Sequence, residues 1–267
     1  MSLQALLFDV DGTLADTERL GHRPAYNKAF KELGLSWKWG PKLYRALLKL
    51  PGGRERLHHY LDKYDPDLGE HAEPAKRDPK EWVGDVHKAK SRYFQELVER
   101  GEIPLRAGVA RLMREALAND VKLAIVTNAS RATLQPVLDH SLGSELSQAV
   151  QLIVCGEQVA RKKPSPDLYL HALRHLQVDA ADCVAVEDSA MGLRAAVAAG
   201  IPTVITVNQN TEHEDFSEAM LVVEDLGDPG DEPAVLRGGP LPGEFVNLRA
   251  LRDLLAARSA LPEAGSR

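Results

Sequence analysis

Acidic and other polar side chains follow several of the apolar runs in this sequence. Asp9 and Asp11 come directly after the run Ala5-Leu6-Leu7-Phe8, in the segment Asp9-Val10-Asp11-Gly12-Thr13. Later runs lead to Thr127-Asn128, to Lys163 within Arg161-Lys162-Lys163-Pro164, and to Glu187-Asp188. The first segment alone is typical of a turn, and Thr127-Asn128 alone is typical of a helix cap. Together they combine carboxylates, a lysine, a hydroxyl and an amide, a set that indicates phosphoryl transfer.

If the carboxylates of these segments lie close together, a nearby positive charge is needed to offset their mutual repulsion. Two like charges about 4 Å apart repel by about 4 kcal/mol at an effective dielectric near 20. A hard divalent cation removes this cost, and Mg²⁺ favours a few carboxylates, waters and a substrate phosphate as ligands. Lys163 adds a charge suited to phosphate, and Thr127 with the backbone N–H after it adds donors. We therefore expect a Mg²⁺-dependent site.

Apolar runs of this length, each bounded by a turn, predict strands that are buried on both faces. Such runs lie at 5–8, 123–126, 152–154, 184–186 and 203–206, and helical spacing occurs between them at 109–117, 168–176 and 191–199. This alternation predicts an α/β fold with a doubly wound, Rossmann-like parallel sheet. Because ligands of such sheets bind at the carboxyl ends of the strands, we expect the polar segments to meet there.

Two segments depart from the alternation. Residues 17–101 show helical spacing and no buried-strand run, which predicts an all-helical domain inserted between core segments 1–16 and 102–267. Residues 227–245 contain nine Gly or Pro among nineteen residues and predict a loop. Asn247, just after this loop, is placed to cap a final helix.

The polar segments resemble the four ordered motifs of the haloacid dehalogenase superfamily, and the insertion after the first motif resembles its helical cap of the first type. The motifs are Asp9-Val10-Asp11-Gly12-Thr13, Thr127-Asn128, Lys163-Pro164 and Glu187-Asp188. Residues 18–23, residues 52–56 and the Gly/Pro-rich C-terminal region are similar to the CbbY group of sugar-phosphate phosphatases. That group usually has lysine where Arg54 stands. The resemblance covers essentially the whole chain.

The resemblance implies a role for each motif residue. Asp9 would attack phosphorus to form an aspartyl phosphate, and Asp11 would protonate the leaving oxygen and then activate water. The carboxylates of Asp9 and Asp188 and the main-chain carbonyl of Asp11 would hold Mg²⁺. Glu187 would be a further ligand or the partner of one. The residues that bind the phosphoryl oxygens would be Thr127, Asn128 and Lys163.

The helical insertion would supply substrate selectivity by closing over the core and excluding water, as caps of this superfamily do. Arg54 lies beside two glycines, and its guanidinium fork is suited to a second phosphate. The further candidates for substrate binding are Glu18, His22, Lys42, Tyr44, Gly53 and Arg56. A second phosphate favours a sugar bisphosphate. The CbbY group is associated with carbon fixation in the Calvin cycle, where it removes Rubisco inhibitors such as xylulose-1,5-bisphosphate.

Composition narrows the partners and the compartment. The chain has 33 Lys and Arg against 39 Asp and Glu, a net charge of −6, which argues against nucleic acid or an anionic membrane as a partner. No run approaches the roughly eighteen apolar residues of a transmembrane helix. Two cysteines, Cys155 and Cys183, indicate neither a disulfide framework nor a thiolate zinc site. We expect a monomeric cytoplasmic enzyme, or a stromal one in a eukaryotic phototroph, acting on a small sugar phosphate.

Two alternatives stay open at this point. A sugar phosphomutase of the β-phosphoglucomutase type shares all four motifs and a similar cap, and differs in protecting its aspartyl phosphate from water. A non-catalytic sugar-phosphate-binding protein on the same scaffold is disfavoured by the complete set of acids and lysine. Dehalogenases of the superfamily lack an acid at the position of Asp11, so Asp11 argues against dehalogenation.

Overall fold

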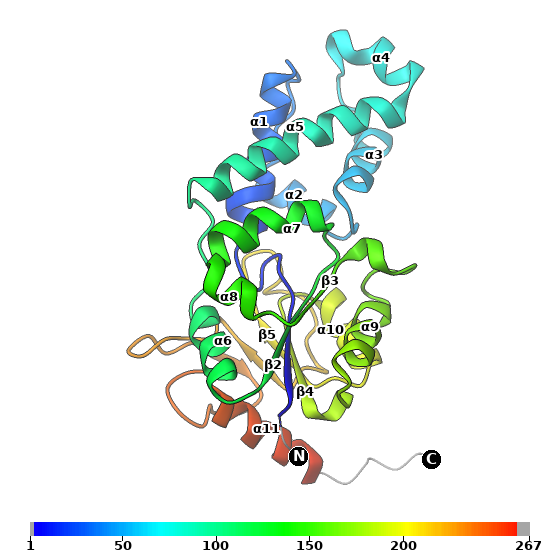
Figure 1. Ribbon diagram of the computed structural model, residues 1–267. Coiled ribbons are helices and arrows are strands. Elements are labelled where there is room, and N and C mark those ends of the chain that lie inside the picture. Colours follow the sequence, from blue (N-terminus) through cyan, green and yellow to red (C-terminus); the bar gives the residue numbers. More distant parts are fainter. Residues whose placement is uncertain (1–2, 261–267) are drawn as a thin grey trace. The chain divides into compact units, whose positions relative to one another are not determined.

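The computed structural model describes residues 3–260, which form two compact units (Figure 1). The first unit comprises Met1–Ala15, Leu105–Ser130 and Leu142–Arg267, and the second comprises Asp16–Pro104 and Arg131–Ser141. Residues 1–2 and 261–267, the two ends of the predicted core, lie outside the described residues. Among the residues described, no helix is both long and apolar enough to cross a bilayer.

A seven-stranded sheet forms the first unit, with the strand order β3-β2-β1-β4-β5-β6-β7. The strands are β1 (Ala5–Phe8), β2 (Lys122–Val126), β3 (Leu152–Val154), β4 (Cys183–Glu187), β5 (Thr203–Thr206), β6 (Leu221–Val223) and β7 (Val235–Arg237). The first six run parallel, and β7 pairs antiparallel with β6. Strand order reverses at β1, where Phe8 pairs with Ile125 of β2 and Val186 of β4. The residues that follow these three strands therefore lie side by side, at the edge where such sheets bind ligands.

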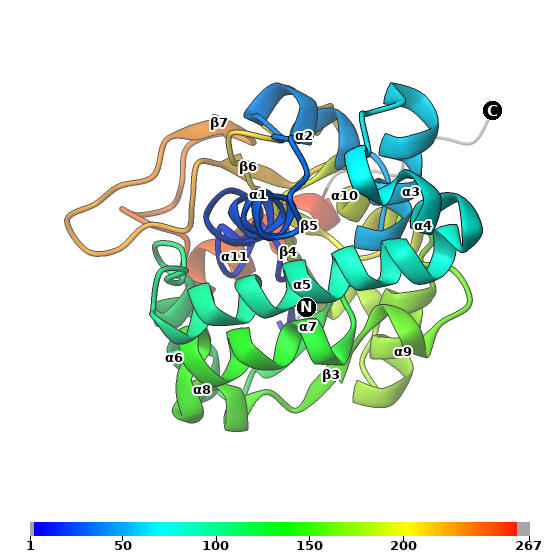
Figure 2. The same cartoon turned by 90° about the horizontal axis from the view of Figure 1, so that it is seen from above.

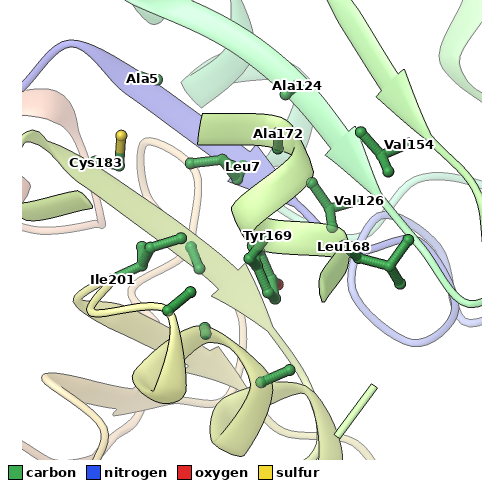
Figure 3. Packing of buried hydrophobic residues seen from close by; sticks show 14 of the residues in the cluster. Ala5, Leu7, Ala124, Val126, Val154, Leu168, Tyr169, Ala172, Cys183 and Ile201 are labelled. Atoms are coloured by element: carbon green, nitrogen blue, oxygen red, sulfur yellow. The ribbon is translucent and has the colours of Figure 1, made fainter. Parts of the chain in front are cut away.

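Helices cover both faces of this sheet. α9 (Asp167–Leu176) and α10 (Ala190–Ala198) lie on one face, and α6 (Val109–Ala118), α8 (Gly143–Ala149) and α11 (Leu248–Ala260) lie on the other (Figures 1 and 2). Leu7 and Val126 of the sheet pack in one buried cluster with Leu168 and Tyr169 of α9 (Figure 3). Successive strand side chains point to opposite faces, so a sheet covered on both sides needs runs that are apolar at every position.

All regular elements in the described part of the second unit are helical. They are a π-helical turn (Glu18–His22), α1 (Arg23–Glu32), α2 (Pro41–Leu47), α3 (Gly53–Tyr64), a 3₁₀ turn (Gly69–His71), α4 (Ala72–Arg77), α5 (Pro79–Glu99), α7 (Arg131–Pro136) and a second π-helical segment (Val137–Leu142) that follows α7. The long helix α5 packs against α1, α3, α4 and α7. Aromatic side chains such as Phe30, Trp37, Trp39 and Tyr60 form the core of this unit. Large rings that lose little side-chain freedom stabilise a core built from short helices.

The predicted fold class, a doubly wound α/β core with a helical insertion, is confirmed. The five predicted strands correspond to β1–β5, and Asn247 caps α11 by accepting the N–H of Ala250 at 2.8 Å. An unbroken loop over 227–245 is wrong, because β7 forms within it and adds an antiparallel edge to the predicted parallel sheet. The two units also differ from the predicted domain boundaries. Residues 131–141, assigned to the core, belong to the helical unit because α7 packs against α5.

Candidate active site

Three carboxylates come together at the carboxyl ends of β1 and β4. Asp9 follows β1, Glu187 ends β4 and Asp188 follows it, and each offers an oxygen that lies within 4.8 Å of the others. All three residues are buried, with exposed fractions of 7%, 1% and 7%. Asp11 is partly exposed and lies outside this group. The parallel register of β1 and β4 thus joins acids that are far apart in the sequence.

The buried ammonium group of Lys163 contacts two of these acids. Its Nζ donates to Asp9 Oδ1 at 2.7 Å, to Glu187 Oε1 at 2.6 Å and to the carbonyl oxygen of Val126 at 2.6 Å. Three acceptors match the three N–H groups of an ammonium ion. Burial lowers the pKa of Lys163, but the carboxylates of Asp9 and Glu187 outweigh burial and raise the pKa above its ordinary value. The lysine is therefore charged.

The rest of the negative charge in the cluster is poorly compensated. Burial raises the pKa of Asp9 from 3.8 to about 8, with Lys163 opposing the rise and Glu187 and Asp11 adding to it. Burial, followed by the charges of Asp9 and Glu187, also raises the pKa of Asp188. A nearby cation would favour the ionised form of both carboxyls. Closely spaced oxygen donors with excess negative charge fit a hard divalent cation such as Mg²⁺.

Two uncharged side chains orient these carboxylates. The hydroxyl of Tyr169, on α9, donates to Glu187 Oε1 at 2.5 Å. The amide of Asn208, in the segment after β5, donates to Asp188 Oδ2 at 2.7 Å. Because a charged acceptor strengthens a hydrogen bond, each contact fixes the direction of a carboxylate as well as stabilising its charge.

The segment after β2 positions the lysine. Thr127 is buried, and its Oγ1 accepts the N–H of Ala129 at 3.0 Å. The side-chain amide of Asn128 pairs with the main chain of Lys163, accepting its N–H at 2.9 Å and donating to its carbonyl oxygen at 3.3 Å. The amide of Asn128 therefore holds the backbone that carries Lys163, and the contact of Asn128 with the phosphoryl group stays a prediction.

Within the helical unit, three of the predicted residues form a second polar cluster. The hydroxyl of Tyr44 donates to Glu18 Oε2, and Arg56 Nη1 donates to Glu18 Oε1 at 3.3 Å. Arg56 is also held by its Nε, which donates to the carbonyl oxygen of Leu50 at 3.0 Å. The nearly buried carboxylate of Glu18 is thus fixed between a hydroxyl and a guanidinium group.

A set of cations and histidines extends this cluster. Nζ of Lys90 lies 2.8 Å from Nδ1 of His22, and the His22 ring stacks on Phe94 with centroids 4.1 Å apart. Burial, followed by the charges of Lys90 and Arg54, lowers the pKa of His87 to about 4. Burial is the main cause of this low pKa, and the cations Lys90, Arg54 and Arg56 around His87 add to it. These three cations are close enough together to attract an anionic group of a ligand.

The other candidates in this unit are placed differently. Arg54 is exposed at the start of α3 and contributes to the charge around His87. A Cβ atom at Gly53 would collide with the His87 ring and the Tyr26 hydroxyl, so packing explains the glycine there. Lys42 is exposed on α2, and within residues 3–260 no hydrogen bond or ion pair joins it to the cluster.

Comparison with known proteins assigns the chain to a family. A model described as a haloacid dehalogenase-like hydrolase matches residues 3–200, well over half of the chain. The chain belongs to the haloacid dehalogenase-like hydrolases. This hydrolase is 47% identical over 250 residues to the plasmid-encoded protein CbbY of Cupriavidus necator, which covers 94% of this chain and 96% of the relative.

Solved structures agree with that assignment. CbbY from Rhodobacter sphaeroides in complex with phosphate matches this hydrolase with a TM-score of 0.75 and 38% identity, over 85% of this chain and 96% of the other. An aspartate-to-asparagine variant of the same protein, in complex with xylulose-(1,5)bisphosphate, gives a TM-score of 0.74 and 38% identity over 84% and 94%. Our hydrolase therefore falls in the CbbY group and is an enzyme of the phosphatase type.

Sequence reasoning missed four residues of these clusters in the hydrolase. Asn208 follows the fifth apolar run closely, so the rule that polar residues after strands form the site would have found it. Tyr169 lies on the buried face of a predicted helix, where its pattern indicates only packing. Lys90 and His87 lie within a long polar helix. Lys90 lies beside His22 and His87 lies near Arg54, and only the packing of the helices brings these residues together.

Proposed function

We propose that this hydrolase removes one phosphate from a small sugar bisphosphate, with Mg²⁺ bound at the core cluster and an aspartyl phosphate as intermediate. The observation that carries the proposal is the buried group of Asp9, Glu187 and Asp188 with the ammonium of Lys163 bonded to the first two. Xylulose-1,5-bisphosphate is the first substrate to test, because the Rhodobacter sphaeroides relative is solved in complex with it.

The metal would be held by the carboxylates of Asp9 and Asp188 and by the main-chain carbonyl of Asp11. Glu187 would be a further ligand, or would act through Lys163 and Tyr169, which both donate to its Oε1. When bound, Mg²⁺ would neutralise charge on the phosphoryl oxygens. Such positioning and neutralisation provide most of the rate enhancement in phosphoryl transfer.

The chain's own residues would carry the covalent steps. Asp9 forms a bond to phosphorus as the bond from phosphorus to the sugar oxygen breaks, and Asp11 gives that oxygen its proton. Asp11 then takes a proton from water, which attacks phosphorus and releases Asp9. Lys163 orients the carboxylate of Asp9 through its 2.7 Å contact and stabilises its ionised form. Thr127, with main-chain N–H groups after β2, would bind the phosphoryl oxygens.

The helical unit would select the substrate. We assign the distal phosphate to the cationic set around His87, with Arg54, Lys90 and Arg56 as its charges. Glu18 would accept hydrogen bonds from hydroxyl groups of the sugar. Tyr44 holds Glu18 in place, and His22 holds Lys90 in place. Arg54 is the exposed member of this set, whereas Lys90 is buried.

The test is a screen for phosphate release from ketose and aldose bisphosphates, with and without Mg²⁺. We expect Mg²⁺-dependent release that falls about a thousandfold or more in Asp9→Asn, as for other catalytic nucleophiles. A sugar 1-phosphate supplied with a trace of bisphosphate separates the alternatives. Isomerised sugar phosphate without free phosphate would establish a mutase, and substrate binding without either product would establish a binding protein.

A further inference from the structure

Arg106 ties together main-chain carbonyl groups from three separate segments of the sheet unit. Its Nη1 donates to the carbonyl oxygen of Gly12 and to the carbonyl oxygen and Oγ1 of Thr206, the last two at 2.9 and 3.2 Å. Its Nη2 donates to the carbonyl oxygens of Val207 at 2.7 Å and Glu224 at 2.5 Å. The turn after β1 is thereby joined to the ends of β5 and β6.

The contact with Gly12 is important because Gly12 directly follows Asp11. Gly12 has a φ of +92°, and its N–H donates to the carbonyl oxygen of Ala15 at 2.8 Å. A Cβ atom at this position would overlap the carboxylate of Asp188 and the amide of Asn208. The backbone here is packed directly against Asp188, so a rotation of the peptide after Gly12 would change the separation of Asp11 from Asp188.

Arginine is well suited to this place. A guanidinium group presents five N–H donors in a rigid plane, so it can satisfy several fixed acceptors at once, whereas a lysine offers three donors on one rotating atom. The main-chain N–H of Arg106 adds a further tie, because it donates to the carbonyl oxygen of Leu14 at 2.9 Å. Both the backbone and the side chain of Arg106 thus hold the turn.

We propose that Arg106 is a positioning residue, which locks the turn bearing Asp11 against the ends of β5 and β6 so that Asp11 and Asp188 keep their catalytic spacing. The inference rests on the proposed function. Arg106 contacts the turn that carries Asp11 and no group that we assign to substrate binding, so its loss should slow the chemical step by misplacing Asp11. Binding of the substrate depends on other residues, and KM is expected to change little.

Arg111 provides a matched control. Its guanidinium group also donates to main-chain carbonyl oxygens, those of Leu226, Gly227 and Val246 at 3.0, 2.6 and 3.0 Å. These segments carry none of the proposed catalytic residues. Arg106→Lys and Arg111→Lys therefore each remove guanidinium hydrogen bonds to several main-chain carbonyl groups. Arg106→Lys does so at the turn that carries Asp11, and Arg111→Lys does so at residues 226, 227 and 246. Arg106→Gln, planar and uncharged, is a second variant of the same position.

The experiment measures kcat, KM and the melting temperature of these variants with p-nitrophenyl phosphate and a sugar bisphosphate. We expect kcat to fall about 10- to 100-fold in both Arg106 variants with both substrates, as misplacement by about 1 Å produces, while KM stays within about threefold. Arg111→Lys is expected to lose a similar amount of melting temperature and to keep kcat within about threefold.

Three results would overturn the inference. In the first, Arg106→Lys leaves kcat unchanged. In the second, Arg111→Lys lowers kcat as much as Arg106→Lys does, and both variants lose the same amount of melting temperature. In the third, the Arg106 variants change only KM. Any of these leaves the proposed function intact, because the wild-type enzyme is active in each. A wild-type protein that releases no phosphate from either substrate with Mg²⁺ overturns the proposed function together with the inference.

Discussion

Lys163 supplies one buried positive charge to a site with three buried carboxylates. Its Nζ bonds Asp9 and Glu187, while Asp188 receives the neutral amide of Asn208. Burial raises the pKa values of both aspartates, so a proton or a cation must accompany the cluster near neutral pH. The binding of metal and the release of protons are therefore coupled at this site.

The first prediction concerns the stability of the metal-free protein. The pKa of Asp9 rises from 3.8 to about 8 on folding, so between these pH values the folded state binds more protons than the unfolded state. The free energy of unfolding therefore falls as the pH rises through this window, by on the order of 1 kcal/mol or more. Urea unfolding in EDTA at pH 5 and pH 8 measures the fall, and Mg²⁺ at pH 8 should reverse it.

Asp188→Asn is the control for this prediction. The asparagine can still accept a hydrogen bond from Asn208 and removes one buried acid. We expect the variant to be as stable as wild type or more so at pH 8 in EDTA, and to gain little from Mg²⁺. Full stabilisation of the variant by Mg²⁺ would contradict the assignment of Asp188 as a ligand.

A second prediction separates substrate selection from chemistry. Arg54→Ala removes an exposed guanidinium group that we assign to the distal phosphate. Because a bidentate contact to phosphate is lost, KM for a sugar bisphosphate should rise about tenfold or more, with KM for p-nitrophenyl phosphate nearly unchanged. Lys63→Ala, which removes another exposed cation from the same helix α3, is the matched control. Equal rises in KM for both substrates would remove Arg54 from this role.

Helix α10 shows how an element positions the site. It begins at Ala190, directly after Asp188 and Ser189, and Ser189 caps it by accepting the N–H of Gly192 at 3.2 Å. Glu214 accepts the N–H of Ala190 at 2.6 Å. The first turn of the helix therefore sets where Asp188 lies, and the cap is part of the site as well as part of the helix.

Removing two helix caps tests this relation as a third prediction. Ser189→Ala and Asn247→Ala each delete a side-chain cap and should each lower the free energy of unfolding by about 1 kcal/mol. Only Ser189→Ala, next to Asp188, should also weaken Mg²⁺ binding, measured as the Mg²⁺ concentration for half-maximal activity. The same Mg²⁺ dependence in both variants would show that α10 does not control the position of Asp188.

Elements differ in how well the sequence predicts them. The strands β1–β5 were predictable because covered strands must be apolar, as in Ala5-Leu6-Leu7-Phe8. All three residues of β7 are exposed, so β7 carries no pattern that distinguishes it from a loop. β6 is buried and lies in the apolar run 219–223, so the rule that found the three-residue strand β3 would also have found β6. The core acids were predictable because they follow strands. Lys90 was not, since its pairing with His22 spans 68 residues and depends on how the helices pack.

At the scale of the whole molecule, exposed apolar surface bears on association. The large apolar side chains exposed in the part of the chain described here are Tyr64, Leu170, Val235 and Leu236, on α3, α9 and β7. Stable protein interfaces usually bury about 1,200 Å² or more around an apolar centre. Only Val235 and Leu236 are adjacent in the chain, which makes a small patch.

The fourth prediction is therefore a monomer at micromolar concentrations, measured by light scattering during gel filtration. The negative net charge of −6 also opposes self-association. A dimer would contradict the prediction. If that dimer were lost in Leu236→Lys, the exposed edge strand β7 would be its interface.

The helical unit is assembled from two stretches of chain, Asp16–Pro104 and Arg131–Ser141. α7 of the second stretch packs on α5 of the first, and the hydroxyl of Ser141 donates to the carbonyl oxygen of Ile103 at 2.7 Å. Recombination between related enzymes that exchanged only the longer stretch would leave α7 facing a foreign helix. Chimeras meant to transfer substrate preference therefore need four crossover points, and gene shuffling with single cuts should rarely produce well-folded hybrids.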